Sequence, residues 1–263
     1  MQIIRVSQIN SKDDMKGCET SPTEILKAFR NIDINEKNKV LEHEKISINE
    51  IHLDPSDVLE SNASIYEGSI NYFEKNFKTI FLGGDHSVTY PIVSAFKKTE
   101  LDPLLIVFDS HIDCSICDKV PGNKEWLREL INDGFDSSKI ILLSTRQILA
   151  DEIEFLEKHK ITMIKMDLLR EGIEDVCDIV MERARKSTGF YVSIDIDSVD
   201  PAFAPGTNSL VPGGISSRDL IYFIKRLSLL KNLKGADIVE INPKRDVNHI
   251  TVLLGAKILS ELV

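Results

Sequence analysis

Residues 79–98 read TIFLGGDHSVTYPIVSAFKK and set a pattern that much of the chain repeats. The apolar run 79–82 leads into two glycines, which permit a tight turn, and then into a helix-like stretch over residues 88–98. A strand followed by a short turn and a helix is the repeating unit of α/β proteins. The turn presents Asp85 and His86 where the strand ends, at the edge of the predicted sheet.

Similar apolar, β-branched runs recur along the chain, with helix-like stretches between them. Several are apolar on both faces, which is typical of strands in a parallel sheet that helices cover on both sides. Ser21-Pro22 and Ser216-Ser217 are helix-start signals ahead of two of the intervening stretches. The alternation predicts a doubly wound α/β fold. The eight candidate strands are residues 3–6, 46–51, 79–84, 104–110, 140–145, 161–166, 190–197 and 236–242.

The length of 263 residues lies at the upper end of the range for one domain, although two small domains remain possible. The chain shows no internal repeat, low-complexity tract or obvious linker. We therefore expect a single domain over residues 1–263. Residues 30–60 are charged and poor in periodicity, and they predict a surface excursion or an edge of the fold.

The charge balance limits the kinds of partner. With 32 Lys+Arg against 42 Asp+Glu, the net charge is −10, and no Lys/Arg-rich run is present. Nucleic acids and anionic membranes both require a positive surface, so we expect neither as the main partner; a small substrate or a metal cation fits better. The chain has few cysteines and no apolar signal-peptide core at its start, which favours the reducing cytoplasm. It also has no apolar run near ~18 residues, which favours a soluble protein. Cys114 and Cys117 are interpreted as structural thiols, because a zinc site would need a second pair of ligands.

Acidic and histidine side chains gather where four candidate strands end. Ligands of open α/β sheets bind beyond the carboxyl ends of the strands, so this is where a site is expected. In an extended segment alternate residues share one face, and we expect the side chains of each cluster to converge for that reason. The residues, in strand order, are His86; Asp109, His111 and Asp113; Asp195 and Asp197; and Glu240.

A single aspartate or histidine at a strand end is usually a cap or turn residue. The whole set is different, because so many carboxylates at close range repel one another unless a cation lies among them. Mixed histidine and carboxylate ligands without cysteine suit Mn²⁺ or another borderline-hard divalent ion. Seven ligands are too many for one such ion with open positions, whereas two ions that share bridging carboxylates use them well. The sequence therefore predicts a binuclear metal site.

Four motifs resemble, in order and spacing, those of the ureohydrolase family of arginase, agmatinase and formimidoylglutamase. They are GGDHS (83–87), DSHID (109–113), SIDIDSVDPAFAPGT (193–207) and EINP (240–243). The resemblance extends over nearly the whole chain. It implies a three-layer α/β/α domain around a mostly parallel eight-stranded sheet. It also implies a homo-oligomer, a trimer or a hexamer.

The same resemblance implies a role for each residue. Two Mn²⁺ ions per subunit would activate a shared water for attack on a guanidinium carbon, releasing urea and an amine. Asp113 would relay the proton to the leaving amine, and Glu240 would pair with the guanidinium. By this likeness one ion would be held by His86, Asp109, Asp113 and Asp195, and the other by Asp109, His111, Asp195 and Asp197.

The loop after DSHID departs from the family pattern. The family usually carries a proton-shuttling histidine there, but this chain has no histidine between residues 112 and 158. Asn123, Lys124 and Glu125 occupy the corresponding neighbourhood. Trp126, the only tryptophan, is expected to pack within the helix that follows. A positioned general acid or base contributes about 10²–10⁴ in rate, so its loss would be measurable.

The loop after residue 207 also departs, since Asn208, Ser209 and Leu210 stand where the family often has Gly-Thr-Pro. In arginases this loop helps to recognise the amino acid end of the substrate, so we expect Asn208 and Ser209 to contact the substrate and arginine to be less favoured. Agmatine is favoured, because an acidic mouth would attract its cationic amine. Arginine, formimidoylglutamate, guanidinobutyrate and guanidine are alternatives.

A different class of function also fits the sequence: a metal-binding but catalytically silent member of the family that acts as a structural or regulatory partner. The missing histidine and the altered loops favour this reading, whereas the complete set of ligands together with Glu240 favours the enzyme. The loop over residues 114–126 discriminates between the two. If Lys124, Glu125 or a residue from elsewhere reaches the metal-bound water, catalysis is possible, and if the loop fills the pocket, only binding remains.

Overall fold

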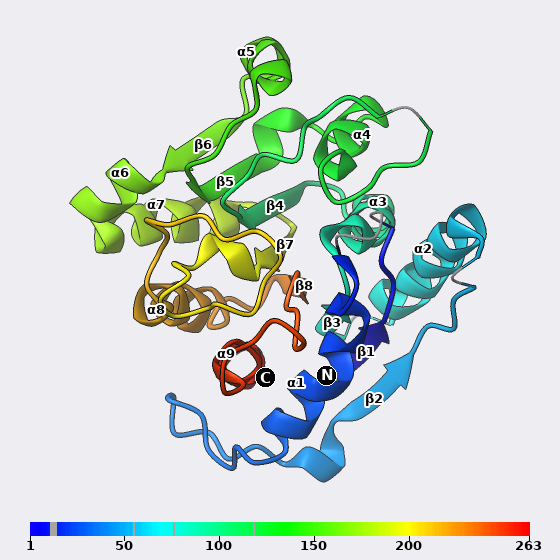
Figure 1. The fold of residues 1–263 in the computed structure, drawn as a ribbon, viewed down its shortest axis with the longest axis vertical. Helices are drawn as coiled ribbons and strands as arrows, with labels where there is room; N and C mark the ends of the chain where they lie inside the picture. The colour runs from blue at the N-terminus through cyan, green and yellow to red at the C-terminus, as the bar shows by residue number, and fades with distance from the viewer. Residues whose placement is uncertain (11–14, 55, 76, 118) are drawn as a thin grey trace.

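The computed structural model describes residues 1–10, 15–54, 56–75, 77–117 and 119–263, and within them the chain forms an eight-stranded sheet (Figure 1). The strand order is β2-β1-β3-β8-β7-β4-β5-β6, and all pairings between neighbouring strands are parallel. Each strand coincides with a predicted apolar run, with ends shifted by at most three residues. The bounds are Gln2–Val6 (β1), Ser47–Glu50 (β2), Thr79–Gly83 (β3), Pro103–Phe108 (β4), Ile140–Thr145 (β5), Thr162–Lys165 (β6), Gly189–Asp195 (β7) and Leu233–Val239 (β8).

Helices cover both faces of the sheet, so the molecule has three layers (Figure 1). One layer contains Ser21–Phe29 (α1), Met166–Glu171 (α6), Ile173–Lys186 (α7), Ser217–Leu227 (α8) and Ile250–Leu262 (α9). The other contains Val58–Glu74 (α2), Thr89–Thr99 (α3), Trp126–Asn132 (α4) and Ile153–His159 (α5). The predicted α/β class and the three-layer architecture are confirmed.

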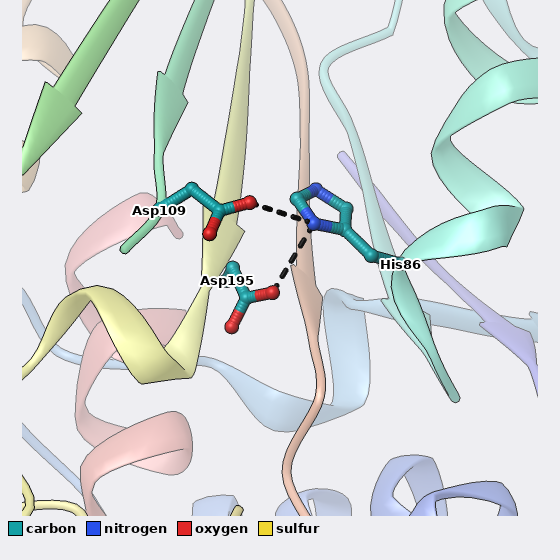
Figure 2. A group of neighbouring side chains, drawn as sticks. All are labelled: His86, Asp109 and Asp195. Carbon is teal, nitrogen blue, oxygen red and sulfur yellow. Dashed lines mark ion pairs between the residues drawn. The ribbon is translucent and has the colours of Figure 1, made fainter. Parts of the chain in front are cut away.

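The strand order places the carboxyl ends of β3, β8, β7 and β4 next to one another at one edge of the sheet. The chain moves from β3 to β4 across the positions that β8 and β7 later fill, which makes this the topological switch point of the sheet. These are the four strands whose ends carry the acidic and histidine residues. His86 follows β3, Asp195 ends β7 and Asp109 follows β4, and the three side chains face one another (Figure 2).

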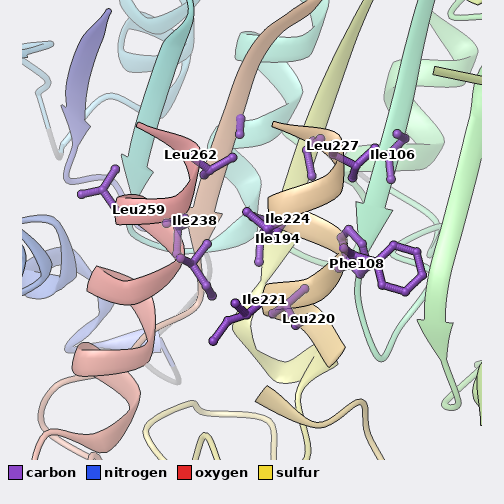
Figure 3. Close-up of a cluster of buried hydrophobic side chains, with 14 of the residues drawn as sticks. Ile106, Phe108, Ile194, Leu220, Ile221, Ile224, Leu227, Ile238, Leu259 and Leu262 are labelled. Atoms are coloured by element: carbon purple, nitrogen blue, oxygen red, sulfur yellow. The ribbon is translucent and has the colours of Figure 1, made fainter. Parts of the chain in front are cut away.

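Successive side chains along each buried strand point to opposite faces of the sheet, so they pack into two separate hydrophobic cores. On β4, Ile106 and Phe108 face the layer that contains α8 and α9, whereas Leu105 and Val107 face the layer that contains α3 and α4. Figure 3 shows the first core, where apolar side chains of α8 and α9 pack against the central strands. Both faces of the strand are buried, which explains why its sequence is a continuous apolar run.

Residues 30–60, predicted as a surface excursion or an edge, include the edge strand β2, which pairs with β1, and a loop that reaches α8 and α9. Glu36 of this loop makes ion pairs with Arg218 and Lys225 of α8 and with Lys257 of α9. The segment is therefore anchored to the helical layer. Among the described helices, none combines the length and the apolar character that a transmembrane span needs.

Candidate metal centre

His86 is held by a chain of hydrogen bonds that starts on the neighbouring strands. Its ring is fully buried, and Nε2 lies 2.9 Å from Oγ of Ser193 on β7. Ser193 Oγ donates its own proton to Oδ1 of Asp237 on β8, at 2.7 Å. The serine oxygen therefore accepts from Nε2–H, which leaves Nδ1 of a neutral His86 ring with a free lone pair.

That lone pair points into a group of carboxylates. Nδ1 lies 3.1 Å from one oxygen each of Asp109, Asp113 and Asp195, all of them buried, and it makes no hydrogen bond within the described residues. Figure 2 shows the contacts with Asp109 and Asp195. A lone pair that faces three carboxylates is repulsive unless a cation lies between them. A spacing of about 3 Å is also the distance between neighbouring ligands around an octahedral ion with bonds of about 2.1 Å. The donor set and its geometry fit a divalent metal.

A second group adjoins the first and shares a residue with it. Nδ1 of His111 lies 3.0 Å from Oδ2 of Asp197 and 3.4 Å from Oδ1 of Asp109. Asp109 thus turns Oδ2 to the first group and Oδ1 to the second, which is the arrangement of a bridging carboxylate. Asp195 reaches the first group through Oδ2, while its Oδ1 accepts the backbone N–H of Asp197. The described residues therefore include two adjacent groups that could each hold a cation.

The clusters converge for a reason that differs from the one the sequence suggests. We expected extended segments, but β4 ends at Phe108, and Asp113 adopts a left-handed backbone with φ 55°. Asp109 accepts the N–H of His111 at 2.7 Å, and Asp195 accepts the N–H of Asp197 at 2.8 Å within the 3₁₀ turn η7 (Ile196–Ser198). Beyond the strand end these N–H groups have no ladder partner, so the carboxylates bind them and tighten the chain into turns.

The electrostatics of the groups favour a bound cation. Burial lowers the pKa of His86, but the surrounding carboxylates outweigh burial and raise the pKa well above its ordinary value. Burial and the charge of Asp109 raise the pKa of Asp113 to about 7, and burial and the charge of Asp197 raise that of Asp195 well above its usual range. These carboxylates thus resist ionisation together. A divalent ion would remove that conflict.

Trp126 contributes more than packing. Its indole Nε1–H donates to Oδ2 of Asp113 at 2.8 Å, and its ring lies 4.7 Å from the His86 ring, centroid to centroid. Sequence reasoning missed this contact, and it also missed Ser193 and Asp237. Two signals were available: Ser193 is in phase with Asp195 along β7, and Asp237 is an acid inside an otherwise apolar strand. No sequence signal connects Trp126 with Asp113.

Glu240 lies beside the metal-ligand candidates, in a left-handed backbone with φ 65° that ends β8 three residues before the predicted end. Its Oε1 accepts the backbone N–H of His86 at 2.8 Å and the side-chain amide of Asn123 at 3.4 Å. Burial and the charge of Asp85 raise the pKa of Glu240 well above its usual range. Asp85 itself binds Ser87 and caps the turn that carries His86.

A cavity of about 330 Å³ opens above these groups. The predicted substrate residues line it: Glu240, Asn208, whose Oδ1 accepts from Asn242, and Ser209, whose Oγ lies 3.2 Å from Nε2 of His111. Asn123 also lines the cavity. A larger cavity of about 560 Å³ between α2 and α3 contains none of the ligand candidates, so its size does not mark it as the site.

Two described residues of the loop over residues 114–126 line this cavity. Asn123 and Lys124 are on its wall, whereas Glu125 turns back to accept the N–H of Gly122 and is not part of the lining. The lining also includes Glu152, whose carboxylate accepts the N–H groups of Cys114 and Leu149. Asn123 and Lys124 thus occupy part of the wall of this cavity.

Comparison with known proteins places the chain in a family. Residues 3–263 match the family model described as the arginase family. The formimidoylglutamase of Halalkalibacterium halodurans is 28% identical over 254 residues, which cover 92% of this chain and 80% of that protein. The mitochondrial arginase 1 of Arabidopsis thaliana is 32% identical over 195 residues, which cover 72% of this chain and 55% of the arginase.

The fold has close solved counterparts. The crystal structure of formimidoylglutamase from Bacillus subtilis superposes with a TM-score of 0.93 over 99% of this chain and 85% of that one, at 23% identity. That likeness concerns the fold, whereas the family model covers the sequence from the first strand to the last helix. The resemblance drawn from the four motifs is confirmed: the chain belongs to the arginase family.

Proposed function

We propose that this chain is a binuclear manganese hydrolase that cleaves a C–N bond of a small guanidino or amidine compound. Hydrolases of the arginase family act on such bonds. The observation that carries the proposal is the position of His86 Nδ1, which is buried and faces three carboxylates at 3.1 Å. Without a metal, the raised pKa of His86 puts a proton at this position. A divalent ion would take the place of that proton and would also neutralise the carboxylates around it.

Each proposed ligand has a place in the two groups. His86, Asp113 and Asp195 would hold one ion, His111 and Asp197 the other, and Asp109 would belong to both. When bound, two such cations supply a hydroxide nucleophile at neutral pH by lowering the pKa of water. The histidine and carboxylate set accepts several divalent metals, and Mn²⁺ is our choice within that set.

The remaining chemistry belongs to side chains of this protein. Glu240 would bind the planar amidinium with charge-assisted hydrogen bonds from the floor of the cavity. Asp113, fixed by Trp126 on one oxygen, would carry a proton to the leaving amine. Asn208 and Ser209 would contact the rest of the substrate. The products would be an amine with urea, or with the corresponding amide when the substrate is a formimidoyl compound.

The open cavity supports the enzyme rather than the silent alternative. A loop that plugged the site would leave no room for substrate, whereas about 330 Å³ is free beside the proposed ligands. Agmatine was favoured on the expectation that an acidic mouth attracts its cationic amine. The residues around the mouth of the cavity are a better guide to the substrate.

The test is product release by the Mn²⁺-loaded protein. Arginine, agmatine, 4-guanidinobutyrate and guanidine would be assayed for urea, and formimidoylglutamate for formamide. We expect turnover of at least one compound and its loss in Asp195→Asn. Asp167→Asn, an exposed aspartate on α6, is the matched control and should keep full activity. Two Mn²⁺ per chain by elemental analysis with no turnover of any compound would contradict the hydrolase and favour the silent reading.

A further inference from the structure

Two cationic side chains, Lys124 and Arg245, stand at the mouth of the acidic cavity. Both are exposed, and both line the cavity whose floor carries Asp113, Asp195 and Glu240. They come from different parts of the fold, Lys124 from the loop before α4 and Arg245 from the turn after β8. The cavity is therefore dipolar, negative at the floor and positive at the rim.

These two cations do not serve to neutralise the floor. In the described part of the chain, neither makes an ion pair within 4 Å, although 42 acidic residues are present in the sequence. Lys244, the neighbour of Arg245, behaves differently, because it pairs with Glu19 at 3.2 Å outside the cavity. Lys124 and Arg245 thus remain available to a ligand.

The backbone under each cation is fixed. The carbonyl of Lys124 accepts the N–H of Ser115 at 2.9 Å, which ties the loop to the strand end that supplies Asp113. The N–H of Arg245 donates to the carbonyl of Asn242, at 3.1 Å. Asn242 is itself tied to Asn208 on the cavity wall. Both side chains therefore project from segments that are hydrogen-bonded to the wall of the site.

We propose that Lys124 and Arg245 form a carboxylate subsite and that the substrate is an amidino or guanidino acid rather than a diamine such as agmatine. This rests on the proposed function, in which the amidinium end lies on Glu240. A cavity of about 330 Å³ is near the small end of ligand pockets, so a short aliphatic chain connects floor and rim. A carboxylate at the far end then meets two cations, whereas the ammonium of agmatine would meet like charge.

Two substrates that differ mainly in the charge at one end test the subsite. 4-Guanidinobutyrate and agmatine carry the same guanidine on chains of similar length, with opposite charges at the far end. We expect kcat/KM for the acid to exceed that for the amine by about tenfold or more, and high salt to narrow the ratio. Lys124→Gln and Arg245→Gln should each lower the ratio about five- to tenfold, and the double change to glutamate should invert it.

Two further variants separate charge from structure. Lys124→Arg retains the charge and should keep the preference for the acid. Lys244→Gln removes a neighbouring cation that does not line the cavity, and it should leave both rates unchanged. A wild type that prefers agmatine, or a ratio that the Gln variants do not move, would overturn the subsite.

Binding without turnover distinguishes this inference from the proposed function. Calorimetric titration of the metal-free protein with the same two compounds should show tighter binding of the acid, weakened in Arg245→Gln. If the acid binds preferentially but the Mn²⁺-loaded protein hydrolyses none of the five compounds, the hydrolase is wrong and the subsite stands. If both compounds are hydrolysed but bind equally, the hydrolase stands and the subsite is wrong.

Discussion

At the scale of single residues, the proposed ligands could be named from the sequence, but the residues that orient them could not. Aspartate and histidine at strand ends carry a recognisable signature. Ser193 and Asp237 carry only weak signals in the sequence, and these signals do not reveal their roles, because the roles depend on which strand lies next to which. Trp126 is similar, since the contact of its indole with Asp113 depends on how the loop before α4 folds back.

The hydrogen bond between Ser193 and His86 can be tested by removing the serine hydroxyl. Ser193→Ala should weaken Mn²⁺ binding about 10–100-fold, because the His86 ring loses the partner that fixes its tautomer. It should also lower the free energy of unfolding by about 1–3 kcal/mol, since Nε2–H and Asp237 lose a buried partner. Metal titration and urea denaturation measure the two effects.

Ser69→Ala is the matched control for that change. Ser69 is equally buried, on α2, but its hydroxyl makes no hydrogen bond within the described residues. Its replacement should leave both the metal affinity and the unfolding midpoint nearly unchanged. Equal effects of the two substitutions would show that burial of a serine, and not the contact with His86, determines the result.

At the scale of elements, the positions of the strands were predictable and the conformations beyond them were not. Apolar runs mark where a strand lies, since both faces of the sheet are covered. The turns that follow are set by hydrogen bonds from backbone N–H groups to Asp109 and Asp195 and by left-handed residues such as Asp113 and Glu240. The residue type alone does not predict that a non-glycine residue will adopt the left-handed conformation.

A substitution of Glu36 tests how the surface loop before β2 is attached to α8 and α9. Its hydrogen bond to Arg218, together with Lys225 and Lys257, lowers the pKa of Glu36 to about 2. Because the folded pKa lies below the unfolded one, the stabilisation is complete above about pH 5 and fades as the pH falls toward 2. Glu36→Gln should therefore cost about 1 kcal/mol at pH 7 and less at pH 3.5.

Urea unfolding of both proteins across this pH range measures the difference. Glu42→Gln provides the control, because Glu42 lies in the same segment but pairs only with exposed Lys45 three residues away. Its effect should be small at every pH. A cost for Glu36→Gln that stays constant down to pH 3.5 would mean that packing, not ionisation, anchors the loop.

At the scale of the whole molecule, the α/β class follows from the alternation of strands and helices, whereas the order of the strands does not. Four strand ends form one site only because β3, β8, β7 and β4 are neighbours in the sheet. That order results from how the two helical layers pack, which depends on contacts between residues far apart in the chain. The resemblance to a family supplied what the periodicity of the sequence could not.

Metal removal tests the site through the stability of the entire fold. Buried carboxylates that repel one another destabilise the metal-free protein, and a ligand that binds only the folded state stabilises it by mass action. Mn²⁺ at about 100 times its Kd should contribute about 2.7 kcal/mol, a rise in Tm of about 5 °C or more over the EDTA-treated protein. Calorimetric melting at several Mn²⁺ concentrations measures the shift.

Asp109→Asn should lose most of that shift, because Asp109 belongs to both groups. Mg²⁺ at the same concentration should stabilise the protein less than Mn²⁺, since imidazole ligands suit the softer ion. A melting temperature that Mn²⁺ leaves unchanged in the wild type would rule out a metal centre at this edge of the sheet.

The place of Trp126 also gives the protein an optical property. It is the only indole in the chain, and it lies 4.7 Å from the ring of His86 and is hydrogen-bonded to Asp113. Light emitted on excitation near 295 nm comes from this one side chain, so a paramagnetic ion that enters beside His86 would quench nearly all of it. Filling of the site can therefore be followed by intrinsic fluorescence in real time, in the unlabelled protein and independently of any substrate.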